Sequence, residues 1–134
     1  MPDPLPIESL NHVALMTRRL DASRAFYCNV LGFREMERPN FNFRGAWLFN
    51  YGLMIHLIEN AKAGEPSEEI QTRENHLALH AGDLARAEQL LVEHGVRYRK
   101  NTIADRGISQ IFFQDPDGNY IELGAYPPTP PFVD

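Results

Sequence analysis

Three histidines and one glutamate stand at corresponding places in two similar stretches of this chain. They are His12, His56, His76 and Glu122. Residues 11–15, Asn-His-Val-Ala-Leu, resemble residues 75–79, Asn-His-Leu-Ala-Leu, at an offset of 64 residues. Residues 52–57, which end in Ile-His-Leu, resemble residues 118–123, which end in Ile-Glu-Leu, at an offset of 66 residues. The chain therefore contains an internal repeat, and each half carries two residues of metal-binding type.

These four side chains suit a first-row divalent metal ion, because imidazole nitrogens and carboxylate oxygens are its common ligands. A lone histidine in an apolar strand is more often a hydrogen-bonded core residue. Four ligand-type residues at repeat-equivalent positions favour the metal-site interpretation over that one. If the two halves pack about an approximate two-fold axis, the corresponding positions can converge on one ion.

The elements that must position these residues follow from apolar patterns and turn residues. Short apolar stretches predict strands at residues 12–15, 46–49, 54–58, 76–79, 111–114 and 120–124. An apolar face over residues 20–31 predicts a helix that ends at Gly32. A second helix is predicted to begin after the N-cap residue Asp83 and to end at Gly95. Each half is thus a strand, a helix and further strands.

Length and composition predict one folded domain. The chain has 134 residues, of which 43% are hydrophobic and 23% charged. A net charge of -5 argues against a general nucleic-acid surface. No apolar run reaches the roughly 18 residues of a membrane span, so no membrane role is expected. The single cysteine, Cys28, favours a reducing compartment, and a cytoplasmic location is predicted.

The connections are also predicted from composition. Residues 115–118, Asp-Pro-Asp-Gly, are typical of a tight turn. Residues 61–74, which contain glycine, proline and several charges, are the natural linker between the halves. Residues 127–134 form a proline-rich tail that we expect to be extended.

Four segments carry a family resemblance. They are Leu-Asn-His-Val at 10–13, the helix end Phe-Tyr-Cys-Asn-Val-Leu-Gly-Phe at 26–33, Asn-His-Leu-Ala-Leu at 75–79, and Phe-Gln-Asp-Pro-Asp-Gly-Asn-Tyr-Ile-Glu-Leu at 113–123. Together they resemble the vicinal oxygen chelate superfamily, which includes glyoxalase I, extradiol dioxygenases, fosfomycin-resistance thiol transferases, methylmalonyl-CoA epimerase and bleomycin-resistance proteins. The resemblance covers about residues 8–126. Residues 38–57 are most similar to the glyoxalase-I-like subgroup.

The resemblance implies an α+β fold of two pseudo-symmetric βαβββ modules that form a curved mixed sheet with a metal-binding cleft. The modules would cover about residues 8–60 and 75–126. The metal ligands would lie on the first and last strand of each module, at His12, His56, His76 and Glu122. Members of the superfamily often dimerise, and in some the two modules that form one site come from different chains. A homodimer is therefore expected.

His56 departs from the glyoxalase I pattern, in which the matching residue is usually a carboxylate. With a divalent ion, three neutral histidines and one glutamate carry a formal charge of +1, whereas the two-carboxylate set would be neutral. The present site should therefore bind an anionic oxygen or hydroxide more strongly. Alternatively, His56 swings away and leaves His12, His76 and Glu122, a set that resembles the extradiol dioxygenases and the thiol transferases.

Residues of the predicted substrate pocket come from the same strands. Aromatic side chains on the concave face and one polar neighbour would line it, with a further residue that matches a glutathione contact in glyoxalase I. These candidates are Trp47, Phe49, Asn60, Gln110 and Phe112. An arginine expected four residues after His12 is replaced by Met16, so a glutathione or other thiol adduct stays one alternative among small substrates.

The resemblance implies metal-assisted proton transfer next to a carbonyl, in an enzyme of the glyoxalase I type. The ion would hold two vicinal oxygens of a small substrate and stabilise the enediolate that forms when Glu122 removes a proton. His56 would complete the ligand set or shuttle the proton. Zn or Ni suits this chemistry best, with Fe(II) or Mn as alternatives. The competing functions are an Fe(II) extradiol-type dioxygenase and a non-catalytic small-molecule or antibiotic-binding protein.

Overall fold

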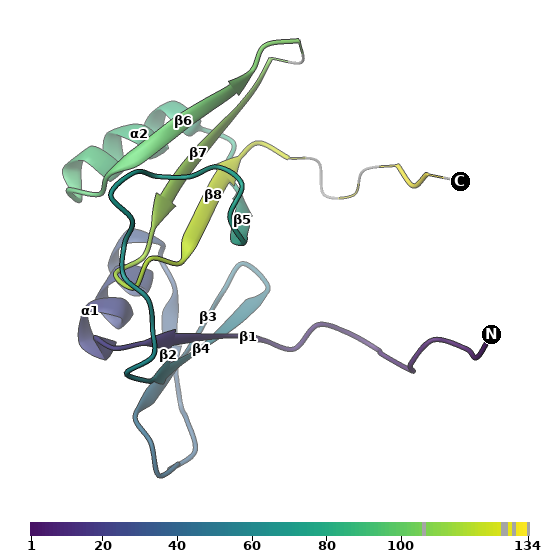
Figure 1. The fold of residues 1–134 in the computed structure, drawn as a ribbon, viewed down its shortest axis with the longest axis vertical. Helices are drawn as coiled ribbons and strands as arrows, with labels where there is room; N and C mark the ends of the chain where they lie inside the picture. Colours follow the sequence, from purple (N-terminus) through teal and green to yellow (C-terminus); the bar gives the residue numbers. More distant parts are fainter. Residues whose placement is uncertain (106, 127–128, 130, 134) are drawn as a thin grey trace.

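The computed structural model describes residues 1–105, 107–126, 129 and 131–133. Its elements fall into two successive modules with the same order of strand, helix and three strands (Figure 1). The first module contains β1 (Val13–Thr17), α1 (Leu20–Ala25), the π-helical turn η1 (Phe26–Val30), β2 (Arg34–Met36), β3 (Gly45–Asn50) and β4 (Leu53–Glu59). The second contains β5 (His76–His80), α2 (Leu84–Glu93), β6 (Tyr98–Ile103), β7 (Ile108–Gln114) and β8 (Tyr120–Gly124).

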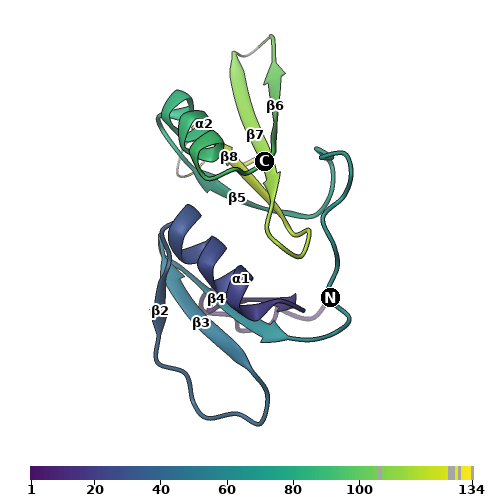
Figure 2. The same ribbon diagram turned by 90° about the vertical axis from the view of Figure 1, so that its left-hand side faces the viewer.

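Each module builds its own four-stranded mixed sheet. The strand orders are β1-β4-β3-β2 and β5-β8-β7-β6, so the first and last strands of a module are neighbours. These neighbours pair in parallel, whereas the other pairs are antiparallel. The predicted α+β fold of two βαβββ modules is confirmed. Figure 2 shows the two sheets as separate layers, with the helices packed along them.

The predicted helix ends are confirmed, with one local difference. The helix from Leu20 continues through η1 and stops before Gly32. Gly32 has a φ of 84°, a conformation that glycine adopts easily because it has no Cβ atom. The second helix begins as predicted, because Asp83 accepts a hydrogen bond from the Arg86 backbone nitrogen at 3.0 Å. In the π-helical turn, the Leu31 N–H donates a 3.3 Å hydrogen bond to the Phe26 carbonyl. The apolar pattern does not predict this turn.

One hydrophobic core joins the helical side of both modules. The aromatic residues of η1, Phe26 and Tyr27, are in the same buried cluster as Phe113 and Ile121 of the second sheet. The rings of Phe26 and Phe113 lie with centroids 6.2 Å apart. Tyr27 is fully buried and donates a 2.7 Å hydrogen bond to Asp115. The helix of the first module therefore fixes the second module through apolar packing and one buried polar contact.

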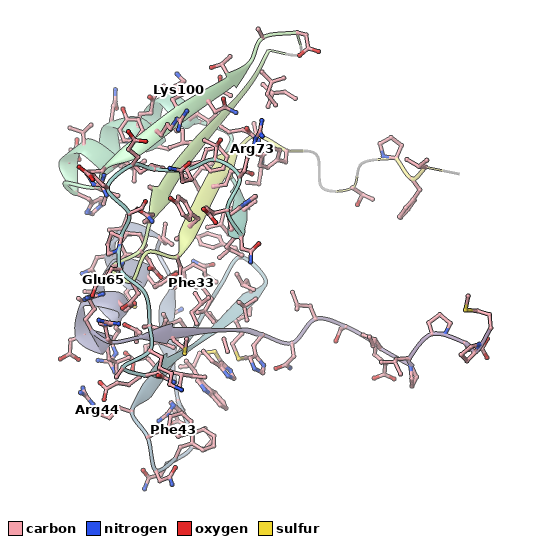
Figure 3. The ribbon with its side chains drawn as sticks, in the orientation of Figure 1. Phe33, Phe43, Arg44, Glu65, Arg73 and Lys100 are labelled. Carbon is pink, nitrogen blue, oxygen red and sulfur yellow. The ribbon has the colours of Figure 1, made fainter. Side chains whose placement is uncertain are left out.

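The turn at residues 115–118 is tied to the start of α1 and to the linker. Buried Asp117 accepts hydrogen bonds from the Arg18 backbone nitrogen at 3.0 Å and from Arg19 Nη1 at 2.9 Å. Arg19 also pairs with Glu65 of the linker at 2.7 Å, and Figure 3 shows Glu65 beside α1. Gly118 has the positive φ, 88°, that the Asp-Pro-Asp-Gly pattern predicts. These contacts give the ligand-bearing strands a fixed frame.

Two regions complete the description. Residues 1–12 extend away from the first sheet without regular structure (Figure 1). Of the predicted extended tail, residues 127, 128, 130 and 134 lie outside the described residues. Among the described helices, none is long and apolar enough to cross a membrane.

Candidate metal centre

The first module brings His12 and His56 together. Ala14 of β1 pairs in parallel with His56 of β4, and His12 precedes Ala14 by two positions, so both side chains lie on the same face. Their rings stack with centroids 3.8 Å apart and planes inclined by 14°. Trp47, which is paired with His56 across β3 and β4, stacks on the other side at 4.2 Å and 5°. His56 is thus held between an imidazole and an indole.

The surroundings of His56 favour its neutral form. Burial is the largest cause that lowers the pKa of His56 from 6.5, followed by the nearby charges of His12 and Arg38. Its Nε2 lies 3.0 Å from the sulfur of Met54, two residues earlier on the same strand. A neutral imidazole has a lone pair that can bind a metal ion, and in this structure the Nε2 that would supply it faces the Met54 sulfur.

The second module brings His76 and Glu122 together in the same way. Ala78 of β5 pairs in parallel with Glu122 of β8, and His76 precedes Ala78 by two positions. The Nε2 of His76 lies 3.7 Å from Oε1 of Glu122. Its Nδ1 lies 2.8 Å from the Glu74 carbonyl, which can only accept a hydrogen bond. The Nδ1 of His76 therefore carries a hydrogen, and Nε2 is the nitrogen on the side of the carboxylate.

Glu122 is a buried carboxylate with two neutral donors. Its exposed fraction is 6%. Gln110 donates to Oε1 at 3.3 Å, and Tyr126 donates to Oε2 at 2.6 Å. Burial, followed by this hydrogen bond, raises the pKa of Tyr126 to about 12, so its phenol keeps the proton that it donates. Asn101 donates in turn to Gln110 at 3.0 Å, which fixes the amide.

Tyr126 was not predicted from the sequence. A weak signal existed, because Tyr126 follows Glu122 by four residues and is an aromatic residue between the last strand and the proline-rich tail. Its role depends on the chain turning back after β8. The backbone nitrogen of Tyr126 donates to His80 Nδ1 at 3.0 Å, which anchors that return.

The two pairs are separate within one chain. Among the residues that the structure describes, no three histidine, cysteine, aspartate or glutamate side chains gather closely enough to hold one metal ion. His12 and His56 belong to the first sheet, and His76 and Glu122 belong to the second. The predicted ligands thus form two half-sites. We call the first the HH pair and the second the HE pair.

The predicted pocket residues divide between these half-sites. Trp47 lies on the HH pair, and Phe49 follows two positions later on the same strand with 44% of its surface exposed. Phe112 pairs with Glu122 across β7 and β8, and its ring lies edge-on to His76 at 6.0 Å.

Asn60 differs from the other pocket candidates, because its carboxamide accepts a 2.8 Å hydrogen bond from the Lys62 backbone nitrogen and caps the turn after β4. The side-chain oxygen of Asn60 is thus already engaged in a hydrogen bond within its own chain.

The donor chemistry of both half-sites fits a divalent ion. The Nδ1 of His12 is held by the Asn11 side-chain oxygen at 2.8 Å, which leaves Nε2 as the ligand atom, as in His76. Hydrogen bonds of this kind to the distal nitrogen orient metal-binding histidines. Glu122 adds an anionic oxygen whose position is fixed by neutral donors.

Paired modules, each closed by the parallel pairing of its first and last strands, define a protein of the paired βαβββ class. Residues 9–123 match the family described as the Glyoxalase/Bleomycin resistance protein/Dioxygenase superfamily. The chain belongs to this superfamily, which confirms the resemblance carried by residues 75–79 and 113–123. Proteins of this superfamily bind small molecules.

Similar proteins include enzymes. The chain is 40% identical over 129 residues to glyoxylase I 4 of Arabidopsis thaliana, a match that covers 90% of this chain and 72% of the relative. It is 32% identical over 124 residues to lactoylglutathione lyase of Salmonella typhimurium, covering 85% of this chain and 90% of the relative.

A solved structure has the same fold. It is a variant of a fosfomycin resistance protein from Listeria monocytogenes, complexed with Mn(II) and a dihydroxypropylphosphonic acid. The two structures agree with a TM-score of 0.76 at 20% identity, over 91% of this chain and 95% of the other. The likeness concerns the fold.

Proposed function

We propose that this protein is a divalent-metal-dependent lyase or isomerase of the glyoxalase I type, acting on a small substrate with two vicinal oxygens. The observation that carries the proposal is the matched register of the two modules, in which the HH pair and the HE pair occupy equivalent places. The similarity to a lactoylglutathione lyase supports the type of reaction. A metal is expected to be Zn or Ni, with Fe(II) or Mn as alternatives.

The roles of the residues follow from their surroundings. His12, His76 and Glu122 would hold the ion, and His56 would complete the set or pass a proton. When bound, the ion would polarise two oxygens of the substrate. Glu122 would take the proton from the neighbouring carbon, because it is a buried carboxylate beside an aromatic wall. Trp47 and Phe112 would exclude water from the two sides of the site.

We propose further that two copies of the chain complete each site. Structural and catalytic zinc sites use three or four protein ligands, and each half-site supplies two. A homodimer with two-fold symmetry would place the HH pair of one subunit against the HE pair of the other, twice. This arrangement uses the donors of both half-sites in full.

Mixing two inactive variants tests this arrangement. His12→Ala spoils the HH pair, and Glu122→Gln spoils the HE pair. A dimer of one chain of each kind has one intact site if sites are shared between chains, and none if each site lies within one chain. After subunit exchange, random pairing restores about a quarter of the sites. Bound metal per chain and activity with methylglyoxal plus glutathione are the readouts.

A surface histidine provides the control. His94 is exposed at the end of α2, so His94→Ala should bind metal like the parent chain. Recovery of metal and activity in the mixture supports shared sites. Metal bound at full stoichiometry by each single variant alone would contradict the roles given to His12 and Glu122.

One observation favours a second function. The Nε2 of His56 faces the Met54 sulfur at 3.0 Å, and a histidine kept there would leave His12, His76 and Glu122. Two histidines and one carboxylate form the facial triad of non-haem Fe(II) oxygenases. Oxygen uptake with a catechol that depends on added Fe(II) would favour a dioxygenase, and its absence alongside Zn- or Ni-dependent lyase activity would favour the first proposal.

A further inference from the structure

A row of aromatic side chains leads away from the HH pair. It begins with Trp47, which stacks on His56, and continues to Phe41, whose ring centroid is 6.2 Å from that of Trp47. Phe41 in turn stacks on Phe43 at 5.3 Å, with planes inclined by 18°. Phe41 and Phe43 are 42% and 43% exposed, and Figure 3 places Phe43 in the connection between β2 and β3. We call these three rings the aromatic row.

A guanidinium group lies beside the two phenylalanines of the aromatic row. The Cζ atom of Arg38 is 4.8 Å from the Phe41 ring centroid and 4.9 Å from that of Phe43. Its Nη2 donates one hydrogen bond, at 2.9 Å, to the Phe43 carbonyl. A Cβ atom on Gly45 would lie 3.1 Å from this Nη2, so the glycine leaves room for the guanidinium against β3. The group is therefore held in place by two rings and a backbone contact.

Arg38 differs from Arg24 and Arg44 in its charge balance. Arg24 pairs with Asp21 and Glu35, and Arg44 pairs with Glu59. Within the described part of the chain, Arg38 has no carboxylate within ion-pair distance, although it is only half-exposed. In a chain of net charge -5, such a cation is a local site for an anion.

The chemistry of a guanidinium narrows the ligand. Arginine has five N–H donors in a planar fork, and one hydrogen bond to a carbonyl leaves most of them available. A carboxylate matches that fork with two parallel hydrogen bonds. Phe41 and Phe43 keep 42% and 43% of their surface exposed, and this exposed aromatic surface favours a planar, conjugated or aromatic body between the anion and the HH pair.

We propose that the aromatic row binds a substrate with a planar body, its vicinal oxygens toward His56 and a terminal carboxylate on Arg38. This assignment rests on the proposed function for the position of the vicinal oxygens, and it adds the substrate class. A site for a small dicarbonyl needs to contact only the reacting atoms. The aromatic row would contact a part of the substrate beyond those atoms, so we expect a larger substrate here.

A pair of probes that differ only in charge tests the assignment. Caffeate has a catechol at one end, a conjugated body and a carboxylate at the other end, and its methyl ester lacks the charge. Calorimetry with the full chain, with Zn and with a chelator, gives the ratio of the two dissociation constants. We expect the parent chain to bind caffeate about tenfold more tightly than the ester.

Three variants locate the effect. Arg38→Gln should reduce the tenfold preference to about equal affinity, and Arg38→Lys should keep part of it, because charge remains without the fork. Arg44→Gln removes a nearby arginine that already pairs with Glu59 and should keep the full preference. Melting temperatures show that each variant is folded.

The outcomes separate this proposal from the proposed function. Equal affinity for the two probes, no binding of either, or a preference that survives Arg38→Gln would overturn the carboxylate site, even if the protein binds metal and acts as a lyase. A preference that depends on Arg38 in a protein that binds no metal would support the carboxylate site and contradict the metal-dependent function.

Discussion

Tyr126 donates a 2.6 Å hydrogen bond to the buried carboxylate of Glu122, from beyond the end of the strand that carries the glutamate. The phenol keeps its proton because its pKa is raised to about 12. The bond fixes one oxygen, and Gln110 fixes the other. Glu122 is therefore oriented before any ligand arrives.

Removal of the Tyr126 hydroxyl should weaken metal binding. In Tyr126→Phe the carboxylate loses its shortest hydrogen bond and gains rotational freedom, and loss of such an outer partner costs about tenfold or more in metal affinity. Competition with a chromogenic chelator measures the dissociation constant. Tyr98→Phe on β6 is the control, since it lies away from the HE pair. Unchanged affinity in Tyr126→Phe would show that Gln110 suffices to hold Glu122.

The stack of His56 on Trp47 predicts a pH-dependent fluorescence signal. Trp47 is the only tryptophan, and protonated imidazole quenches a neighbouring indole more strongly than neutral imidazole. Because burial and the charges of His12 and Arg38 lower the pKa of His56, the quenching in metal-free protein should have its midpoint below pH 6.5. In His56→Gln the transition should disappear. A midpoint at or above pH 6.5 would contradict the stacked, half-buried position.

The lowered pKa of His56 also predicts how the stability of the protein changes with pH. His56 holds its proton less tightly when folded than when unfolded, so the unfolded chain takes up more protons in the window below pH 6.5. Acidification through that window therefore favours unfolding. Urea titrations of the parent chain and His56→Gln at pH 7 and pH 5.5 should show a smaller acid-induced loss in the variant.

Gly118 is predicted to tolerate no side chain. Its φ is 88°, and an added Cβ would meet the backbone carbonyl of Glu65 in the linker. Gly118→Ala should lower the free energy of unfolding by about 1–3 kcal/mol. The alanine would be strained at this φ, and its Cβ atom would push the turn at residues 115–118 against the backbone of Glu65. Gly82→Ala is the matched control, since nothing lies within 4 Å of its added Cβ. Equal stability of the two variants in urea unfolding would contradict the tight turn.

His56→Glu tests the charge of the proposed site. With a divalent ion, the change takes the formal charge of the four-ligand set from +1 to zero, which should weaken an anionic inhibitor about tenfold and raise the pH at which bound water ionises. Inhibitor affinity against pH, metal stoichiometry and activity with methylglyoxal plus glutathione are the readouts. His94→Glu on the surface is the control. If inhibitor affinity, metal stoichiometry and activity are all unchanged in His56→Glu, His56 is not a ligand.

The strand positions could be predicted because the repeat marks them twice. The strand predicted at 120–124 is β8 with the same bounds, and its partner in the repeat is β4. Strands β2 and β6 were not delimited, because all residues of β2 are exposed and β6 is mostly polar, so neither shows apolar alternation.

The composition of each half-site was predictable, but its environment was not. The repeat identifies equivalent residues: His12 is equivalent to His76, and His56 is equivalent to Glu122. How the modules face each other depends on long-range packing, such as that of Phe26 on Phe113, which no local pattern encodes. The stack of Trp47 and the return of Tyr126 are contacts of the same kind. The convergence of all four ligands on one ion stays a prediction.

Each half-site is made by the first and last strands of its own module, in direct parallel contact. We therefore expect a mutation in one pair to leave the strand pairing that holds the other pair in place. Natural variation can change one half of the donor set while the other half is inherited intact. In such a scaffold the donor set can change one half at a time, so that a carboxylate at position 56 would alter the HH pair while the HE pair keeps its own strands.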